Sequence, residues 1–218
     1  ESTDLVDVAH RLSEKGYVTV RFTSSGFGDS DGTLQDDYSL SQYRRDVDVM
    51  HRYVSALPYV NASRLGVYGH SMGGKLAVLF THNHPDIQAL CVVSAPVSFA
   101  GTLYEQLRPD WEKTGYFEHN SSRDGKGIRI PYVYYIDEEK SEHDVLAAAG
   151  ELANPHALVI AGDADTEVPW QETERIFSAL NCPKEFLLLD GVEHKYKYQK
   201  GFFPIVHTPV VHFFEKNL

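Results

Sequence analysis

Apolar residues along the chain follow two spacings, one of three to four residues and one that is nearly continuous over four to six. The first spacing places apolar side chains on one face of a helix, and the second is typical of a strand buried in a sheet. The predicted helices cover residues 5–12, 43–57, 75–80, 171–180 and 210–216, the last beginning after Pro209. The predicted strands cover residues 17–22, 65–68, 89–94, 156–161 and 185–189.

Strands that alternate with helices predict the α/β class, with a mostly parallel sheet and helices on both of its faces. The 218 residues suffice for one hydrophobic core, so we expect a single domain over residues 1–218. Residues 96–152 interrupt the alternation with Trp111 and several other aromatic residues among many charges. Because reactive groups gather at the carboxyl ends of parallel strands, the residues after each strand are the first candidates for a site.

Composition and charge narrow the expected partners. The net charge of −11 at pH 7 argues against nucleic acid and against anionic membrane surfaces, because both would repel the protein. No apolar run approaches the roughly 18 residues of a membrane-spanning helix, so no stable membrane insertion is expected. Cys91 and Cys182 are the only cysteines, and two isolated cysteines make neither a metal site nor a disulfide framework. A reducing compartment, the cytoplasm, is slightly favoured; the oligomeric state stays open.

Ser71 is the strongest candidate for a reactive residue. It lies in the run GHSMGG of residues 69–74, a G-x-S-x-G motif between the predicted strand at 65–68 and the helix at 75–80. A glycine-flanked turn from strand to helix exposes the central side chain and holds it in a strained conformation. This setting predicts that Ser71 is a nucleophile rather than an ordinary loop serine.

A serine hydroxyl needs a base to take its proton, and a histidine base needs a carboxylate to fix its tautomer. The base candidate is His194, which follows the last predicted strand. The carboxylate candidates are Asp163 and Asp165, which follow the strand at 156–161. The alternative for Asp165 is a loop carboxylate that caps the next helix, and for His194 an ordinary loop histidine.

These motifs resemble those of the α/β-hydrolase superfamily, within its small-cap esterase and lipase-like branch. The run at 69–73 is similar to the nucleophile elbow of the family. The pattern G-x-x-D-x-x-V-P at 162–169 is similar to its acid loop, which favours Asp165 over Asp163. The pattern G-x-x-H at 191–194 is similar to its histidine loop.

The resemblance implies a catalytic triad of Ser71, Asp165 and His194, with the backbone N–H of Met72 in the oxyanion hole and a cap insertion at about 96–152. It implies a serine hydrolase that cleaves carboxylic esters of a small to medium or aromatic acyl group through an acyl-enzyme. Cinnamoyl or feruloyl esterases and monoacylglycerol lipases are the closest types. The expected partner is a small-molecule ester, with no cofactor and no metal. The alternatives are a peptidase or amidase of the same fold, and a non-catalytic hydrolase-like protein or inactive fragment.

The remaining histidines are predicted to be structural. His70 is expected to pack beside the turn, and His82 and His84 close the helix after it, where positive charge is favourable. His119 and His143 lie in the expected cap. No histidine pair has a convincing partner for zinc.

One part of the family pattern has no counterpart in the sequence. Family members usually have three strands before the helix with which this chain opens, and the third lies between the strands predicted here at 17–22 and 65–68. That strand leads into a loop whose backbone N–H is the second oxyanion donor, for which we find no candidate. We therefore expect the natural polypeptide to extend N-terminally, or its first section to be missing from these 218 residues. The alternative is that the two flanking strands pair directly.

Overall fold

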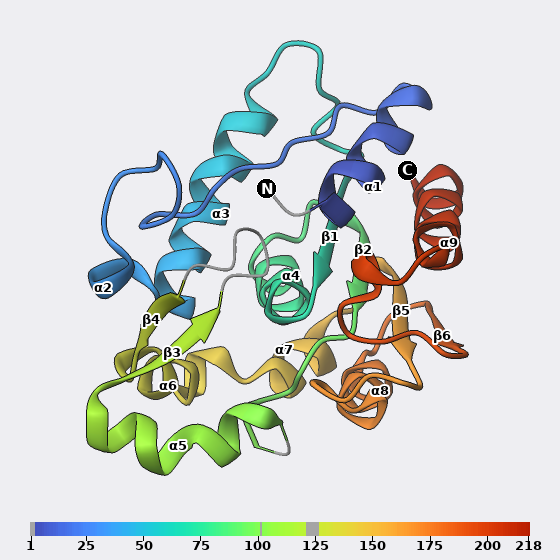
Figure 1. Cartoon of the computed structure of the whole chain (residues 1–218). Coiled ribbons are helices and arrows are strands. Elements are labelled where there is room, and N and C mark those ends of the chain that lie inside the picture. Colours follow the sequence, from blue (N-terminus) through green and yellow to red (C-terminus); the bar gives the residue numbers. More distant parts are fainter. Residues whose placement is uncertain (1–2, 101, 121–126) are drawn as a thin grey trace.

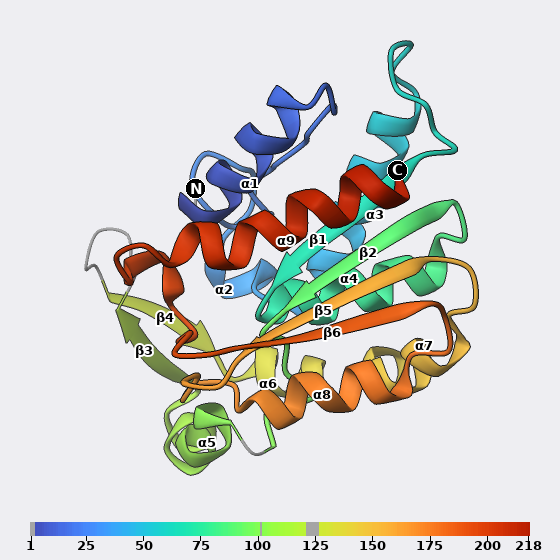
Figure 2. The same cartoon turned by 90° about the vertical axis from the view of Figure 1, so that its right-hand side faces the viewer.

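In the part of the chain that the structure describes, a parallel sheet of four strands forms the centre (Figure 1). The computed structural model describes residues 3–100, 102–120 and 127–218. In the order of their pairing, the strands are β1 (Leu65–His70), β2 (Ile87–Val93), β5 (His156–Gly162) and β6 (Lys184–Leu189). Every pairing is parallel, and Figure 2 shows the strands side by side. The prediction of an α/β fold with a mostly parallel sheet is confirmed.

Helices cover both faces of the sheet, because successive side chains of a strand point to opposite faces. Leu90 and Val92 of β2 belong to the apolar cluster of one face, and Cys91 and Val93 to that of the other. The first face carries α3 (Leu40–Ser55), α4 (Met72–Asn83), α7 (Val145–Glu151) and α8 (Trp170–Ala179). The second carries α1 (Thr3–Glu14) and α9 (Phe202–Asn217). Figure 1 shows α4 and α9 on opposite sides of the strands.

Between β2 and β5 the chain forms a largely separate aromatic layer. Its elements are α5 (Leu103–Thr114), the antiparallel hairpin of β3 (Tyr116–Asn120) and β4 (Gly127–Pro131), α6 (Val133–Glu138) and the short η1 (Ser141–His143). Trp111 is fully buried in this layer, and its Nε1–H donates to the carbonyl oxygen of Ile130 at 3.0 Å. In contrast, α7 packs in the core of the sheet. The cap boundaries at about 96–152 stay a prediction.

The predicted strand at 17–22 is wrong. These residues have no strand pairing, and the side chains of Val18, Val20 and Phe22 are 50%, 41% and 39% exposed. An alternating apolar pattern becomes a strand only where a neighbouring backbone accepts its hydrogen bonds. In the described residues β1 pairs with β2 alone, so segment 17–22 and β1 do not pair directly. The expectation of a strand between them stays a prediction.

The last helix begins earlier than its sequence indicates. α9 starts at Phe202, and Pro209 lies inside it rather than before it. Proline removes one helical hydrogen bond, but the burial of Val206, Val210 and Phe214 against the sheet outweighs this loss. Two short elements, α2 (Leu34–Asp37) and η2 (Tyr196–Tyr198), complete the described structure. None of the described helices has the length and apolarity that crossing a membrane requires.

Candidate active site

The chain turns sharply at Ser71, between the end of β1 and the start of α4. Its backbone has φ 58° and ψ −129°, a conformation that residues other than glycine rarely adopt. A Cβ at Gly69 would lie 2.0 Å from the carbonyl oxygen of Gly73, and one at Gly74 would lie 2.8 Å from Cβ of Ala95. The glycines of the motif therefore permit the close backbone approach that holds Ser71 in this position.

The structure brings the three predicted side chains together in one hydrogen-bonded chain. Nε2 of His194 lies 2.9 Å from Oγ of Ser71, and Nδ1 of His194 lies 2.8 Å from Oδ2 of Asp165. The other oxygen of Asp165 accepts the backbone N–H groups of Glu167 at 3.0 Å and Val168 at 2.8 Å. Asp165 and His194 are both buried. With both its oxygens bonded, the carboxylate is fixed to accept Nδ1–H, which leaves Nε2 to accept the serine proton.

Three loops at the carboxyl edge of the sheet supply these residues. Ser71 follows β1, Asp165 follows β5 and His194 follows β6. Oδ1 of Asp163 accepts the N–H of Gly191 at 2.7 Å and so joins the acid loop to the histidine loop. The geometry thus distinguishes the two aspartates: Asp165 faces the imidazole, and Asp163 supports the loop that carries it.

Met72 is the first residue of α4, directly after Ser71. The first N–H groups of a helix have no acceptor within the helix and lie at the positive end of its dipole. The N–H of Met72 is therefore suited to stabilise negative charge that develops beside Ser71. Its role in an oxyanion hole, and the absence of a second donor from the sequence, stay predictions.

Sequence reasoning missed the buried support behind His194. The hydroxyl of Tyr196 lies 3.2 Å from Nε2 of His207, whose Nδ1 lies 2.7 Å from Oδ2 of Asp7. Burial raises the pKa of Asp7, but hydrogen bonds, first that from His207, outweigh it and hold the pKa below its usual value. The ring of His70 stands 5.0 Å from that of His194 and also contacts Tyr196. Spacing along the sequence does not indicate this group, because its members come from α1, β1, η2 and α9.

The aromatic layer adjoins the residue after Ser71. Met72 packs against the cluster formed by buried aromatic residues, among them Phe99, Trp111 and Tyr134. Burial raises the pKa of Tyr134 well above its usual value, so the hydroxyl stays protonated at neutral pH. For His119, which the sequence placed in the cap, the pKa is lowered, chiefly by burial. Met72, one residue after Ser71, thus contacts the buried aromatic cluster.

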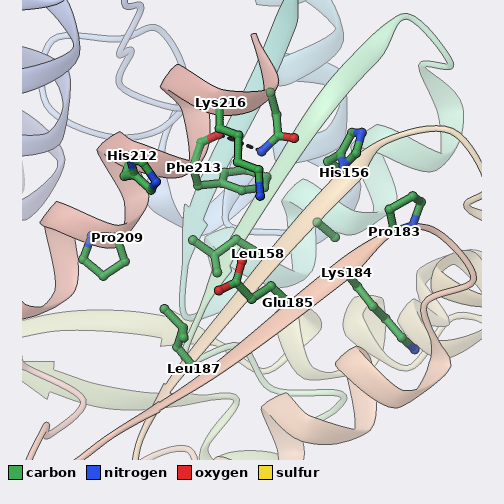
Figure 3. Close-up of a pocket in the computed structure, with 12 residues that line it drawn as sticks. His156, Leu158, Pro183, Lys184, Glu185, Leu187, Pro209, His212, Phe213 and Lys216 are labelled. Atoms are coloured by element: carbon green, nitrogen blue, oxygen red, sulfur yellow. Dashed lines mark hydrogen bonds between the residues drawn. The ribbon is translucent and has the colours of Figure 1, made fainter.

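A separate hollow of about 380 Å³ lies beside α9, at the opposite ends of β5 and β6 (Figure 3). Its lining includes His156 at the start of β5, Lys184 and Glu185 at the start of β6, and His212 and Lys216 of α9. The Ser–His–Asp residues lie beyond the other ends of the strands, so this hollow is not part of their site. No triad residue belongs to a potential metal-binding group within the described residues.

Known protein sequences resemble this chain. A family model described as "Hydrolase_4: Serine aminopeptidase, S33" matches residues 1–114. The uncharacterized protein YfhR of Escherichia coli (strain K12) is 28% identical over 185 residues, which cover 84% of this chain and 55% of YfhR. The chain thus spans about half the length of that curated relative.

Two solved structures have the same fold. The monoacylglycerol lipase of Paleococcus ferrophilus superposes with a TM-score of 0.79 at 15% identity, over 100% of this chain and 91% of the lipase. Est1E from Butyrivibrio proteoclasticus with bound ferulic acid gives a TM-score of 0.74 at 22% identity, over 100% of this chain and 84% of Est1E. At these identities the likeness shows the fold alone.

Proposed function

The chain belongs to the serine aminopeptidase S33 family of α/β-hydrolases, and we propose that it is a serine hydrolase that cleaves carboxylic esters. The observation that carries the proposal is the continuous hydrogen-bonded chain from Ser71 through His194 to Asp165. It supplies a nucleophile, a base and an orienting carboxylate in the arrangement that acyl transfer requires.

In the proposed reaction, Oγ of Ser71 attacks the ester carbonyl while Nε2 of His194 takes its proton. Asp165 stabilises the imidazolium through Nδ1–H, and the N–H of Met72 donates to the oxyanion. The imidazolium then protonates the departing alcohol, which leaves an acyl group on Ser71. Water, deprotonated by His194, attacks this acyl-enzyme; the acid is released and the serine proton is restored.

The acyl group is proposed to be small to medium in size, or aromatic. The support is the aromatic layer that contacts Met72 beside the nucleophile. The names of two structural neighbours agree with this class, since one is a monoacylglycerol lipase and the other holds ferulic acid. Fixed aromatic rings would bind such a group by apolar burial and by ring contacts.

Two other functions are kept as candidates. The family model is described by an aminopeptidase, which favours a peptidase or amidase that uses the same three side chains. The second candidate is a non-catalytic protein or an inactive fragment. It is favoured because the sequence offers no candidate for a second backbone N–H that stabilises the oxyanion. Loss of one such donor costs roughly 100- to 1000-fold in turnover.

A fluorophosphonate probe, followed by sequencing of the labelled peptide, tests the nucleophile. We expect the label on Ser71, its loss in Ser71→Ala, and its retention in the control Ser63→Ala, which removes an exposed loop hydroxyl. The absence of label from folded wild-type protein would refute the assignment.

Substitution of the two neighbouring aspartates tests the role of the carboxylate. Asp165→Asn should lower kcat by on the order of 10⁴-fold, because the imidazole is then held in the wrong tautomer. Asp163→Asn keeps an oxygen that can accept the N–H of Gly191, and it should cost far less. Comparison of nitrophenyl esters of short to long acyl chains, methyl ferulate and an anilide separates esterase, lipase and amidase.

The expected partner remains a small-molecule ester, with no nucleic acid and no stable membrane insertion; the net charge of −11 supports this proposal. A reducing compartment such as the cytoplasm is proposed because Cys91 and Cys182 are both buried free thiols. Cell fractionation with an antibody against the protein tests the compartment.

A further inference from the structure

Two histidines and two aspartates from distant parts of the sequence meet beside α3. Asp48 and His51 lie one turn apart on that helix, and His84 and Asp86 lie in the turn between α4 and β2. The ring centroids of His51 and His84 are 4.2 Å apart. One donor atom each from His51, His84 and Asp86 lies within 4.8 Å of the other two.

The four side chains are already ordered by their contacts. Nε2 of His51 lies 2.7 Å from Oδ2 of Asp86, and Nε2 of His84 lies 2.9 Å from Oδ1 of Asp48. The ring of Phe80 stands 5.5 Å from that of His51 and 4.3 Å from that of His84, so it forms an apolar wall behind both. The histidine side chains are 15% and 19% exposed, which leaves them largely desolvated and still within reach of an ion.

We propose that His51, His84 and Asp86 bind a zinc ion, or a transition-metal dication of similar preference. Imidazole nitrogen together with carboxylate oxygen suits zinc, whereas magnesium and calcium prefer oxygen ligands alone. Metal ions bind imidazole in its neutral form and carboxylate in its ionised form, so a dication also offsets negative charge from the aspartates. Donors around a tetrahedral zinc ion lie about 3.3 Å apart, so small side-chain rotations bring these three to the ion.

Asp48 acts as a positioning residue rather than as a ligand. Its carboxylate holds Nε2–H of His84 at 2.9 Å, so Nδ1 of that ring is the nitrogen that binds the ion. A carboxylate behind a ligating histidine fixes the ring and its tautomer and raises its basicity. Loss of such a partner weakens metal binding by roughly 10- to 100-fold.

The site lies far from the hydrolytic residues. Asp86 directly precedes β2, whereas Ser71 follows β1, and the paired strands run in parallel between them. Six residues of strand span about 20 Å. The ion therefore ties α3 to the turn before β2, and its effect is on stability.

Isothermal titration of the chelator-treated protein of 218 residues with zinc chloride tests the site. The matched control is His82, which lies close to His84 at the end of α4 and pairs with one carboxylate, Glu151, at 2.7 Å. Wild type and His82→Gln should bind one zinc ion per chain at the site with equal affinity. His84→Gln and Asp86→Asn should lose this binding, and Asp48→Asn should retain it at roughly 10- to 100-fold lower affinity.

Two further measurements distinguish the site from nonspecific histidine binding. Cobalt(II) in place of zinc should give the visible absorption of a tetrahedral ion in wild type and in His82→Gln, and not in Asp86→Asn. Zinc should raise the Tm of wild type and His82→Gln and leave that of His84→Gln and Asp86→Asn unchanged, with circular dichroism confirming that each variant is folded. The proposal is overturned if wild type binds zinc no more tightly than Asp86→Asn, or if His82→Gln weakens binding as much as His84→Gln.

Discussion

Replacement of Glu138 by glutamine should destabilise the protein by about 3–5 kcal/mol, because it removes the counter-charge of a buried ammonium. Lys75, on the helix that begins after Ser71, forms an ion pair with Glu138 of α6, and the two residues are only 1% and 2% exposed. Burial raises the pKa of Glu138, even though the charge of Lys75 opposes this shift. The desolvation of the Glu138 carboxylate thus outweighs its attraction to Lys75. The pair therefore adds little net stability, but removal of one partner is costly because it leaves the other charge buried and unpaired.

Urea unfolding of Glu138→Gln measures this cost, and for a chain of this size it corresponds to a Tm lower by roughly 6–20 °C. The control is Glu118→Gln, which breaks the exposed pair with Arg129 and should change stability by no more than about 1 kcal/mol. The double variant Lys75→Met with Glu138→Leu replaces both charges by apolar groups and should be near wild type or more stable.

Two results would refute this reasoning. The first is a loss of less than about 1 kcal/mol in Glu138→Gln, comparable to that of an exposed pair. The second is a loss of stability in the double variant that equals the sum of the losses in its two single variants. Additive losses would mean that the two charges do not interact.

Three further changes test other parts of the structure. Gly69→Ala should prevent soluble folding or fluorophosphonate labelling, because its Cβ would overlap the backbone of Gly73, whereas Gly73→Ala meets no atom within 4 Å and should fold normally. Trp111→Phe should cost about 1–3 kcal/mol in urea unfolding, since the buried carbonyl of Ile130 loses its donor. Burial lowers the pKa of His143 below its ordinary 6.5, so the unfolded chain binds this proton more readily. The stabilising contribution of His143 is present above pH 6.5 and is lost as the pH falls below that value. His143→Gln should therefore flatten the dependence of the free energy of unfolding on pH in this range. An unchanged slope would contradict this prediction.

The sequence allowed the sheet and the three hydrogen-bonded side chains to be predicted because each carries a local signal. Buried strands such as β2 and β5 are continuous apolar runs, and a glycine turn marks the position of Ser71. The order of strands in a parallel sheet then brings loops far apart in sequence to one edge. Position after a strand left Asp163 and Asp165 both open, and the resemblance of residues 162–169 to the acid loop of the family favoured Asp165.

Features that depend on tertiary partners could not be predicted in this way. Segment 17–22 has the composition of a strand but no neighbouring strand in the described structure, and α9 continues through Pro209 because the sheet buries its apolar face. The approach of His51 and His84 follows from the packing of α3 against α4. Neither the spacing nor the composition of the sequence predicts that these two rings lie in contact.

The outer edge of β1, which adjoins no strand in the described residues, has a consequence for how the molecule behaves in solution. Within the described part of the chain this edge joins no strand, and the β1 sequence LGVYGH contains no lysine, proline or acidic residue. Natural proteins use such residues to block pairing between molecules, and a strand edge without them is a template for addition of a foreign strand. Preparations of these 218 residues should therefore self-associate as their concentration rises. A lysine introduced at an outward-facing position of β1 should keep them monomeric.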